Sequence, residues 1–348
     1  MIERKIKPGF CCFGITDKCA LRCKMCLKWR EDLLVKEYTV APSIAQWKRS
    51  ILELAQIVEF PFELDLGGGE ALLYDGILDV VNFSVKNNFY TSIASNGYII
   101  DEDMAKKIAD SGLSIINISL DSIKEKTHDY LRGVDGVYRR VMDAIGHLHK
   151  YCSKMPINIC CVIYAINQEE ILDLIKWANQ DERIRVISFM AVMQPNNTYC
   201  EKDWWLENSY SFLWPKNPRR TIDLIEEIIA LKNKGLKIGN PVSQLRAFQA
   251  YYKDPARFVK RKQCNLDRAV LVSSVGDVFL CYEFERLGNI KDSCLSEVWY
   301  SEKADRVRRQ IASCGKNCHH LLNCFKEFEE DFPEKDNNHI TSGLKTDG

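Results

Sequence analysis

Three cysteines, Cys19, Cys23 and Cys26, stand within eight residues near the start of the chain. Three thiolates at this spacing can hold one compact metal centre, and soft thiolates favour zinc or iron–sulfur clusters. A structural zinc site needs a fourth protein ligand, and the sequence places none nearby. A four-iron cluster held by three cysteines instead leaves one iron open to a small-molecule ligand. The residues therefore favour an iron–sulfur cluster over zinc.

A second cysteine group lies near the C-terminus and consists of Cys264, Cys281, Cys314, Cys318 and Cys324. Their spacings differ from the paired CxxC pattern of zinc ribbons, which argues against a zinc ribbon. His319 and His320 stand beside Cys318, and imidazole is a zinc ligand, so a zinc site stays open for this group.

The other cysteines divide into core thiols and unassigned thiols. Buried thiols are expected where cysteine falls in an apolar run, as it does at Cys11, Cys12, Cys160 and Cys161. Three scattered cysteines have no clear role: Cys152, Cys200 and Cys294. The total of 15 cysteines does not indicate a disulfide scaffold, because such scaffolds are small secreted domains.

The composition excludes several classes of protein. The chain has 348 residues, 46% of them hydrophobic, which is enough for a sizeable core. Its 48 Lys and Arg residues balance 48 Asp and Glu, and a formal charge of zero argues against nucleic-acid binding. No apolar stretch of signal-peptide length follows Met1, and the most apolar run, 157–166, is too short to span a bilayer. We therefore expect a cytoplasmic protein without a membrane partner, in a compartment that keeps thiolates reduced.

The elements that must position the first cysteine group come from the first 195 residues, which alternate strand and helix patterns. Between the strands, Ser43 with Gln46 forms a capping box, and Asp101 and Gly112 bracket a later helix. Six βα units predict a parallel sheet covered by helices. The cysteines directly follow the first strand, at the sheet edge where such folds place their chemistry. The strand-like runs cover 10–16, 62–67, 90–95, 114–120, 157–165 and 186–192.

The segment Thr16-Asp17-Lys18-Cys19-Ala20-Leu21-Arg22-Cys23-Lys24-Met25-Cys26 resembles the signature of the radical S-adenosylmethionine (radical SAM) superfamily. The family usually has an aromatic residue at the position of Met25. The resemblance implies that the three cysteines hold a [4Fe–4S] cluster whose open iron chelates the amino and carboxylate groups of SAM.

Further matches follow in order at the ends of later strands. Gly68, Gly69 and Glu70 resemble the family's Gly-Gly-Glu motif, which contacts the SAM amino group, with Ala71 in place of the usual proline. Glycines allow a close approach of the backbone, and a carboxylate accepts hydrogen bonds from an ammonium. The resemblance implies further SAM-binding residues at Ser95, Asn96, Ser119, Asp121 and Arg132.

The second cysteine group resembles the SPASM/twitch extension of radical SAM enzymes, which carries auxiliary [4Fe–4S] clusters. Phe328 stands where the two-cluster version has its next cysteine, and no later cysteine exists, so we expect one auxiliary cluster. Cys264, Cys281 and Cys318 are the firmest expected ligands, and the fourth is either Cys314 or Cys324.

The resemblance implies a partial (β/α)6 TIM-like barrel followed by a small cysteine-rich C-terminal domain. We predict that the barrel covers residues 1–195, and that residues 196–263 form a helical, aromatic-rich segment that is either a linker or lies near the substrate. The auxiliary-cluster domain is predicted over 264–332, and a disordered tail over 333–348.

The implied reaction begins when an electron donor such as flavodoxin or ferredoxin reduces the cluster, which cleaves SAM to a 5′-deoxyadenosyl radical. The radical then abstracts a hydrogen from the substrate. Most enzymes of this architecture modify peptides, so we expect a maturase that oxidises or crosslinks a ribosomally made precursor. Only 18 residues precede Cys19, so an N-terminal peptide-binding domain is not expected.

Three alternatives stay open at this stage. The enzyme could dehydrogenate a small molecule such as a sugar or an aminocyclitol. It could return a hydrogen atom to a peptide and act as an epimerase, for which Cys200 is the candidate thiol donor. The chain could also be a metal-binding module without catalysis, although such a module would not need the Gly-Gly-Glu element.

Overall fold

The computed structural model of the protein describes residues 6–29, 40–195, 203–207, 209–256, 264–315 and 320–323. Cys200, Cys318, Cys324 and the predicted tail 333–348 lie outside these residues, and so does His319.

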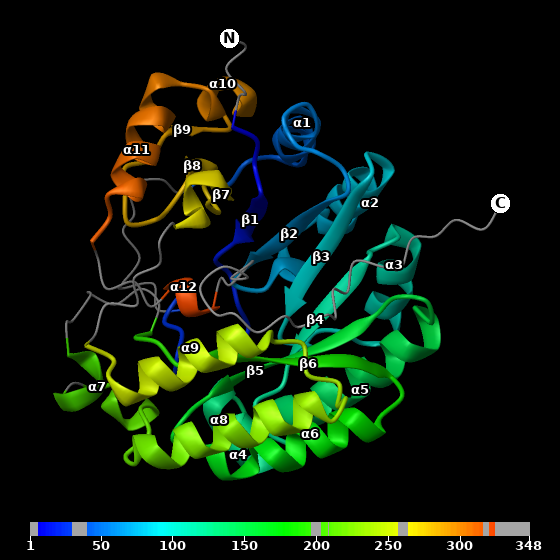
Figure 1. Ribbon diagram of the computed structural model, residues 1–348. Helices are drawn as coiled ribbons and strands as arrows, with labels where there is room; N and C mark the ends of the chain where they lie inside the picture. Colours follow the sequence, from blue (N-terminus) through cyan, green and yellow to red (C-terminus); the bar gives the residue numbers. More distant parts are fainter. Residues whose placement is uncertain are drawn as a thin grey trace.

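The centre of the fold is a nine-stranded sheet in the order β6-β5-β4-β3-β2-β1-β7-β8-β9. Strands β1 to β6 are parallel to their neighbours and follow chain order (Figure 1). All six predicted strands are confirmed, with ends that differ by at most two residues. They are β1 (Phe10–Thr16), β2 (Phe62–Gly68), β3 (Phe89–Ser95), β4 (Ile115–Ser119), β5 (Ile157–Ile163) and β6 (Ile184–Ala191).

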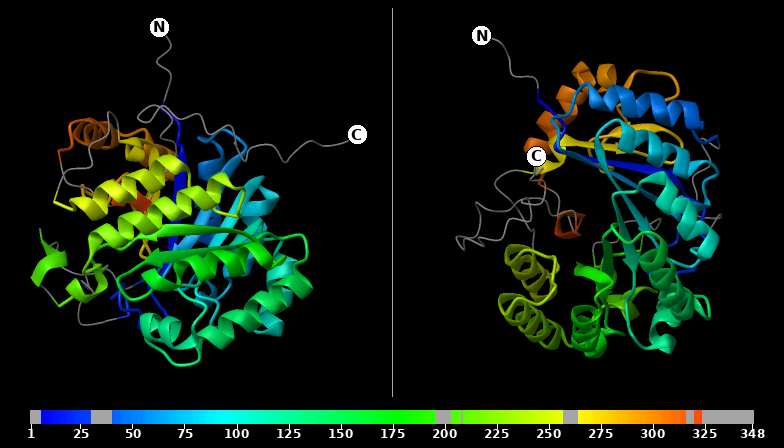
Figure 2. Two further views of the ribbon diagram at one scale, coloured as in Figure 1. Left: turned by 60° about the horizontal axis from the view of Figure 1, so that its bottom comes forward. Right: turned by 90° about the vertical axis from the view of Figure 1, so that its right-hand side faces the viewer.

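Helices follow the strands and cover one face of the sheet, which curves into part of a barrel (Figures 1 and 2). The predicted capping box of Ser43 with Gln46 begins the first of them. Asp101 caps the third, and Gly112 ends it in the left-handed region, as expected. The six helices are α1 (Ile44–Ala55), α2 (Ile77–Lys86), α3 (Glu102–Ser111), α4 (Glu125–Arg132), α5 (Val137–Tyr151) and α6 (Ile171–Gln180). A short 3-10 turn, Ala71–Leu73, follows β2, and another, Gln168–Glu170, precedes α6.

The main core lies between the strands and these helices. Alternate side chains of each strand point toward the helices, and those of Phe13, Leu64, Ile116 and Ile159 are fully buried there. The Phe13 ring packs 5.3 Å from the Trp47 ring of α1. The helices thus cover the outer face of the barrel, and the intervening side chains of each strand belong to its inner face.

The C-terminal region continues the same sheet. β7 (Ala269–Val272) pairs in parallel with β1, and β8 (Asp277–Phe279) and β9 (Gly288–Asn289) add antiparallel strands beyond it. The 3-10 turn Asn265–Arg268 precedes β7, and three helices follow β9: α10 (Leu295–Trp299), α11 (Glu302–Ala312) and α12 (His320–Asn323). Helix α1 holds this region, because Glu53 accepts a hydrogen bond from the Leu295 amide at 2.7 Å. The two cysteine-bearing regions therefore share one framework.

The middle segment contributes a buried aromatic cluster: Trp204, Trp205, Trp214, Tyr251 and Tyr252. These residues come from α7 (Trp204–Glu207), α9 (Val242–Lys253) and the residue after the 3-10 turn Ser211–Leu213. The Tyr252 hydroxyl donates to the Ile163 carbonyl at 2.8 Å and accepts from the Val192 amide at 3.1 Å. The aromatic side chains therefore pack as core at the carboxyl ends of β5 and β6.

The free edge of β6 is covered by groups that imitate a further strand. The Ile187 amide donates to the Lys237 carbonyl, and the Gly239 amide donates back to the Ile187 carbonyl, both at 2.8 Å. At Phe189 the Asn240 side chain takes over, accepting from the amide at 2.6 Å and donating to the carbonyl at 2.8 Å. Asn323 of α12 does the same at Ala191. Asn240 precedes α9, after α8 (Pro218–Asn233), and both helices lie beside this edge (Figure 2).

Replacing Asn240 with alanine should lower the free energy of unfolding by about 2–4 kcal/mol, because two buried backbone groups of Phe189 lose their partners. Chemical denaturation measures the change. The control Asn233→Ala alters an exposed amide at the end of α8 and should stay within about 0.5 kcal/mol of the parent. Equal stability of the two variants would show that the Asn240 amide does not close the sheet edge.

Among the helices that the structure describes, none combines the length and the apolar character needed to cross a membrane.

Candidate SAM and iron–sulfur site

The predicted first cysteine group lies on the loop after β1, at the carboxyl end of the parallel strands. Cys23 is buried, and Cys19 and Cys26 are half-buried. Two backbone hydrogen bonds flank Cys23: the Arg22 amide donates to the Arg132 carbonyl at 3.0 Å, and the Lys24 amide donates to the Leu131 carbonyl at 2.9 Å. The loop is therefore held against the last turn of α4.

The Gly-Gly-Glu element lies directly against the same loop. The Gly69 amide donates to the Thr16 carbonyl at 2.6 Å, and the Glu70 amide donates to the Lys18 carbonyl at 2.8 Å. A side chain at Gly69 would place its Cβ less than 3.0 Å from the carbonyl oxygens of Asp17 and Lys18. Only glycine permits this approach, so the fold brings the two predicted motifs together.

Glu70 is a fully buried carboxylate that is only partly satisfied. Its Oε2 accepts a hydrogen bond from the Asn96 amide at 2.8 Å, whereas Oε1 has no hydrogen-bond partner among the described residues. Burial raises the pKa of Glu70 to about 7. A buried carboxylate with an unused oxygen fits a cationic ligand, and the SAM amino group is such a ligand.

Asn96 connects this carboxylate to the cysteine loop. Its side-chain amide donates to Cys19 Sγ at 3.6 Å, and its Oδ1 accepts from the Tyr98 amide at 2.9 Å. Ser95, the last residue of β3, is buried, and its hydroxyl accepts from the Gly97 amide at 3.1 Å. The predicted residues after β1, β2 and β3 thus converge on one place.

Burial also acts on the thiols. It raises the pKa of Cys23 to about 11, while the neighbouring Arg132 cation opposes the rise, and it raises the pKa of Cys19. Iron binding must displace these protons. Within the described part of the chain, no three His, Cys, Asp or Glu side chains converge on one point as a single metal ion requires. A four-iron cluster needs a different arrangement, one thiolate for each of three irons.

The predicted residues at and after the end of β4 differ in burial and in their contacts. Ser119 is half-buried, whereas Asp121 and Arg132 are buried and form an ion pair with 2.8 Å between Oδ2 and Nη2. Asp121 Oδ1 also accepts from the Val162 amide of β5 at 3.0 Å. Contact of Ser119, Asp121 and Arg132 with SAM stays a prediction.

The family model described as the radical SAM superfamily matches residues 13–191, which contain all of these groups. The chain belongs to the radical SAM superfamily. Residues 264–324 match the SPASM model, an iron–sulfur cluster-binding domain. The protein is therefore a radical SAM enzyme that uses SAM, a [4Fe–4S] cluster and an auxiliary iron–sulfur cluster. The partly satisfied Glu70 carboxylate fits the SAM amino group, and the three free thiols of the cysteine loop fit the [4Fe–4S] cluster.

Relatives with curated names carry out different reactions. The chain is 24% identical to Fe-coproporphyrin III synthase of Methanosarcina barkeri over 321 residues, which are 85% of this chain and 74% of that protein. It is 31% identical to GTP 3′,8-cyclase of Nautilia profundicola over 196 residues, which are 54% of this chain and 58% of that enzyme. The chain thus spans little more than half the length of this cyclase.

Solved structures confirm the partial TIM barrel with its C-terminal domain. The structure of anSMEcpe with bound AdoMet superposes on this chain with a TM-score of 0.64 at 18% identity, over 91% of this chain and 85% of that chain. Streptococcus suis SuiB bound to its precursor peptide SuiA gives 0.63 at 17% identity, over 87% of this chain and 67% of that chain. At these identities the likeness shows the fold alone.

The SPASM cysteines are only partly described. Cys281 is buried two residues after β8, and Cys264 and Cys314 are half-buried before β7 and after α11. Because Cys318 and Cys324 lie outside the described residues, the choice between Cys314 and Cys324 as fourth ligand stays a prediction, as does a single auxiliary cluster.

Two of the four expected core thiols are not fully buried. Cys11 and Cys161 are buried as expected, but Cys12 and Cys160 are half-buried. Neighbouring residues on a strand point to opposite faces, so these two lie on the inner face of the barrel. Of the scattered thiols, Cys152 is buried and donates to the Ala105 carbonyl at 3.4 Å, and Cys294 lies 3.1 Å from the Ser296 hydroxyl at the start of α10.

The sequence interpretation missed a link between the radical SAM loop and the SPASM region. Asp17 accepts hydrogen bonds from the Ser274 hydroxyl and from Lys28 Nζ, the latter at 3.1 Å. Ser274 follows β7, whose pairing with β1 brings the two segments together. A separation of 257 residues between Asp17 and Ser274 leaves no local signal for this contact.

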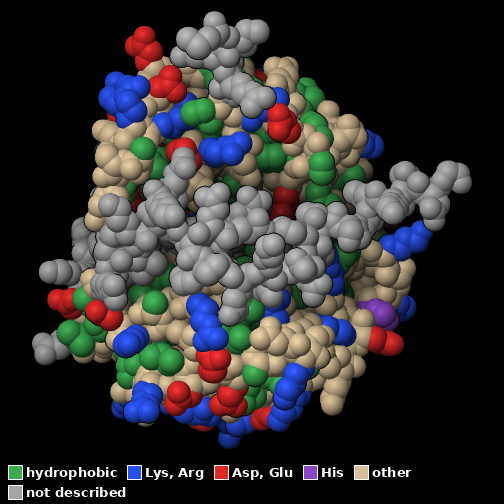
Figure 3. Space-filling view, in the orientation of Figure 1, with side chains coloured by type: hydrophobic (Ala, Val, Ile, Leu, Met, Phe, Trp, Pro, Cys, Tyr) green, Lys and Arg blue, Asp and Glu red, His purple; other side chains and the backbone are tan. Residues whose placement is uncertain are grey.

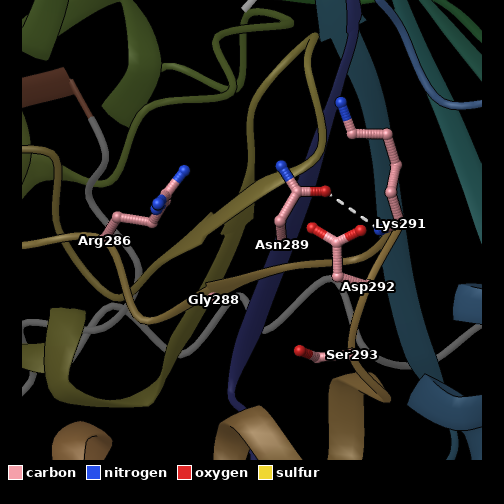
Figure 4. Close-up of a pocket in the computed structure, with 6 residues that line it drawn as sticks. All are labelled: Arg286, Gly288, Asn289, Lys291, Asp292 and Ser293. Atoms are coloured by element: carbon pink, nitrogen blue, oxygen red, sulfur yellow. Dashed lines mark hydrogen bonds between the residues drawn. The ribbon is translucent and has the colours of Figure 1, made fainter.

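The SPASM region also holds a cavity of about 260 Å³ near β9 (Figure 4). None of its lining residues is a predicted ligand, and its basic side chains make contacts within the protein: Arg286 pairs with Asp277 at 2.8 Å, and Lys291 Nζ donates to the Val40 carbonyl at 3.0 Å. The cavity is lined by Arg286, Gly288, Asn289, Lys291, Asp292 and Ser293. On the face seen in Figure 3, described basic and acidic side chains are intermixed, in keeping with the zero net charge.

Proposed function

We propose that this radical SAM enzyme oxidises or crosslinks a peptide. Bound together, SAM and its cluster supply the radical that abstracts a substrate hydrogen. The chain itself holds the cysteine loop, offers Glu70 to the SAM amino group and presents the inner face of the barrel to the substrate. Family membership excludes the non-catalytic alternative.

The observation that carries the proposal is a row of hydrogen-bonding side chains on the inner face. Ser92 donates to Asp65 across β3 and β2, and Asn158 Nδ2 donates to Asn117 Oδ1 at 3.0 Å across β5 and β4. Asn158 Oδ1 is buried and has no hydrogen-bond partner among the described residues. An unsatisfied buried acceptor costs free energy until a donor arrives, and a peptide amide is a suitable donor.

SuiB, whose fold this chain shares over 87% of its length, is bound to a precursor peptide, so a peptide is a substrate class that this fold can accommodate. A porphyrin is the second candidate, since Fe-coproporphyrin III synthase aligns with 85% of this chain. The polar inner face favours the peptide. A sugar or aminocyclitol as substrate stays a prediction, and so does reduction by a donor such as flavodoxin or ferredoxin. The epimerase alternative depends on Cys200, which lies outside the described residues.

The test is anaerobic incubation of the reconstituted enzyme with SAM, a reductant, and either a precursor peptide encoded beside its gene, iron-coproporphyrin or a panel of sugars. Mass spectrometry measures 5′-deoxyadenosine and the loss of hydrogen from each candidate. Oxidation of the peptide alone is the expected result. Oxidation of the porphyrin or a sugar, with the peptide unchanged, would overturn the proposed substrate and leave the family assignment intact.

Replacing Asn158 with leucine should weaken peptide binding at least about tenfold, because it removes an acceptor worth about 1.5 kcal/mol. SAM cleavage in the absence of peptide should be unchanged, since Asn158 lies on the inner face and not on the cysteine loop. The control Asn82→Leu removes an amide on the outer helix α2, which donates to the Ser111 carbonyl at 3.3 Å. Equal peptide affinity in both variants would remove the inner face from substrate recognition.

A further inference from the structure

Arg132 is a buried cation beside the loop that carries the first cysteine group. Its side chain is 6% exposed. Although burial disfavours its charged form, the Asp121 carboxylate and the Cys23 thiol hold the pKa of Arg132 above its ordinary value. The ion pair with Asp121 occupies Nη2 of Arg132. Its Nε has no hydrogen-bond partner among the described residues. The guanidinium thus lies between a carboxylate on one side and a predicted cluster ligand on the other.

The backbone fixes this arrangement. The carbonyls of Leu131 and Arg132 accept the two hydrogen bonds that flank Cys23. Gly133 ends α4 with a φ of +71°, and a Cβ there would come closer than 3.0 Å to the Arg22 carbonyl oxygen. The end of α4 and the cysteine loop are therefore in direct contact, and the Arg132 side chain begins at that contact.

Hydrogen bonds also hold Asp121 in place, on the side of the guanidinium that faces away from the cysteine loop. Its Oδ1 is bound by the Val162 amide, and its backbone carbonyl accepts from Asn167 Nδ2 at 2.8 Å. Its own amide donates to His128 Nδ1 at 3.2 Å. The carboxylate is thereby held on the β5 side of the guanidinium.

The stability of the fold does not by itself account for such a buried ion pair. Taking two charges out of water is costly, and apolar side chains of similar volume often serve a fold as well or better. A function follows from the charges that the loop would carry. Three thiolates bound to iron bring negative charge into this buried site, and reduction of a cluster adds one more electron. A fixed cation beside Cys23 favours the reduced state, and the carboxylate behind it moderates the effect.

We propose that Arg132 is a positioning residue that holds the Cys23 segment and sets how readily the cluster there accepts an electron. The negative charge of Asp121 partly offsets the effect of the Arg132 cation. This inference rests on the family assignment of the cysteine loop within the proposed function, and not on the identity of the substrate.

The two charges predict opposite effects, which a merely structural role does not. In the reconstituted full-length enzyme without substrate, Arg132→Met should shift the midpoint potential of the SAM-binding cluster to more negative values, and Asp121→Asn should shift it to less negative values. We expect at least about a tenfold change in the ratio of reduced to oxidised cluster at fixed potential, which is about 59 mV for a one-electron couple. Redox titration followed by electron paramagnetic resonance measures the shift, and iron analysis checks loading.

Arg132→Lys keeps the charge and should stay near the parent potential. Where Arg132→Met does not fold, Asp121→Asn alone tests the proposal, because an unchanged or more negative potential in that variant would overturn it. Unchanged potentials in both Arg132→Met and Asp121→Asn, or shifts of the same sign, would overturn the proposal. Because no substrate is present, these outcomes are distinct from the peptide test: a failed peptide assay with opposed potential shifts would reject the substrate and keep the role of Arg132.

Discussion

Replacing Gly69 with alanine should abolish SAM cleavage, with a loss of at least about a hundredfold that corresponds to about 3 kcal/mol. The new Cβ would come closer than 3.0 Å to the backbone carbonyl oxygens of Asp17 and Lys18. Backbone atoms cannot rotate away as a long side chain can, so either the cysteine loop or the turn after β2 must move. Both carry predicted cofactor-binding groups, since Cys19 follows Lys18 and Glu70 follows Gly69.

Two measurements show whether the cysteine loop or the turn after β2 moves in Gly69→Ala. Iron analysis after anaerobic reconstitution should fall by about four irons per chain if the loop no longer binds its cluster. The rate of 5′-deoxyadenosine formation should fall whichever segment moves. The matched control is Gly146→Ala within α5, where a Cβ meets nothing within 4 Å. That variant should keep iron and activity and gain about 0.5–1 kcal/mol of stability. Full activity in Gly69→Ala would show that the contact between the two motifs is not required.

The barrel was predictable because its signals are local. An apolar run such as 157–163 must be buried, and the capping box at Ser43 and the glycine at 112 specify where their helices begin and end. The cysteine loop and Gly69 were predictable for the same reason, since short motifs lie at successive strand ends. The convergence of these motifs on one edge then follows from the parallel order of the strands.

What the sequence did not reveal is mostly long-range. No local pattern indicates that β7 pairs with β1, that Ser274 reaches Asp17, or that the amides of Asn240 and Asn323 close the edge of β6. One signal was present and not used. Cys160 and Cys161 are adjacent on a strand, and adjacent strand residues point to opposite faces, so only one of the two could face the helix-covered core.

Replacing Glu70 with glutamine should raise the stability of the cluster-free protein at alkaline pH and at the same time weaken SAM binding. Burial raises the pKa of this carboxyl from 4.5 to about 7 in the folded protein. Between these two values the folded state binds a proton that the unfolded state releases, so the free energy of unfolding falls as pH rises through this window. Above pH 7 the shifted pKa of Glu70 lowers the free energy of unfolding by roughly 3 kcal/mol. A neutral glutamine removes this pH dependence.

Denaturation of the cluster-free protein at a series of pH values measures the effect. Glu70→Gln should match the parent near pH 4 and exceed its stability near pH 8. The control Glu125→Gln alters a carboxyl that is 38% exposed in a surface ion pair with Arg139, and the parent's slope should persist there. If Glu70→Gln kept the same slope, the buried carboxyl would not be the group that titrates.

SAM binding to the reconstituted enzyme should respond in the opposite direction. We expect the SAM ammonium to donate a charge-assisted hydrogen bond to the Glu70 carboxylate. Bonds of this kind are worth about 1.5–3 kcal/mol, so Glu70→Gln should lose roughly 10- to 100-fold in SAM affinity. The glutamine Oε1 can still accept from the Asn96 amide, so the local structure is retained. If replacing Glu70 stabilises the protein but weakens SAM binding, the buried charge of Glu70 serves ligand binding and not the stability of the fold. Unchanged SAM affinity would instead assign Glu70 to the fold alone.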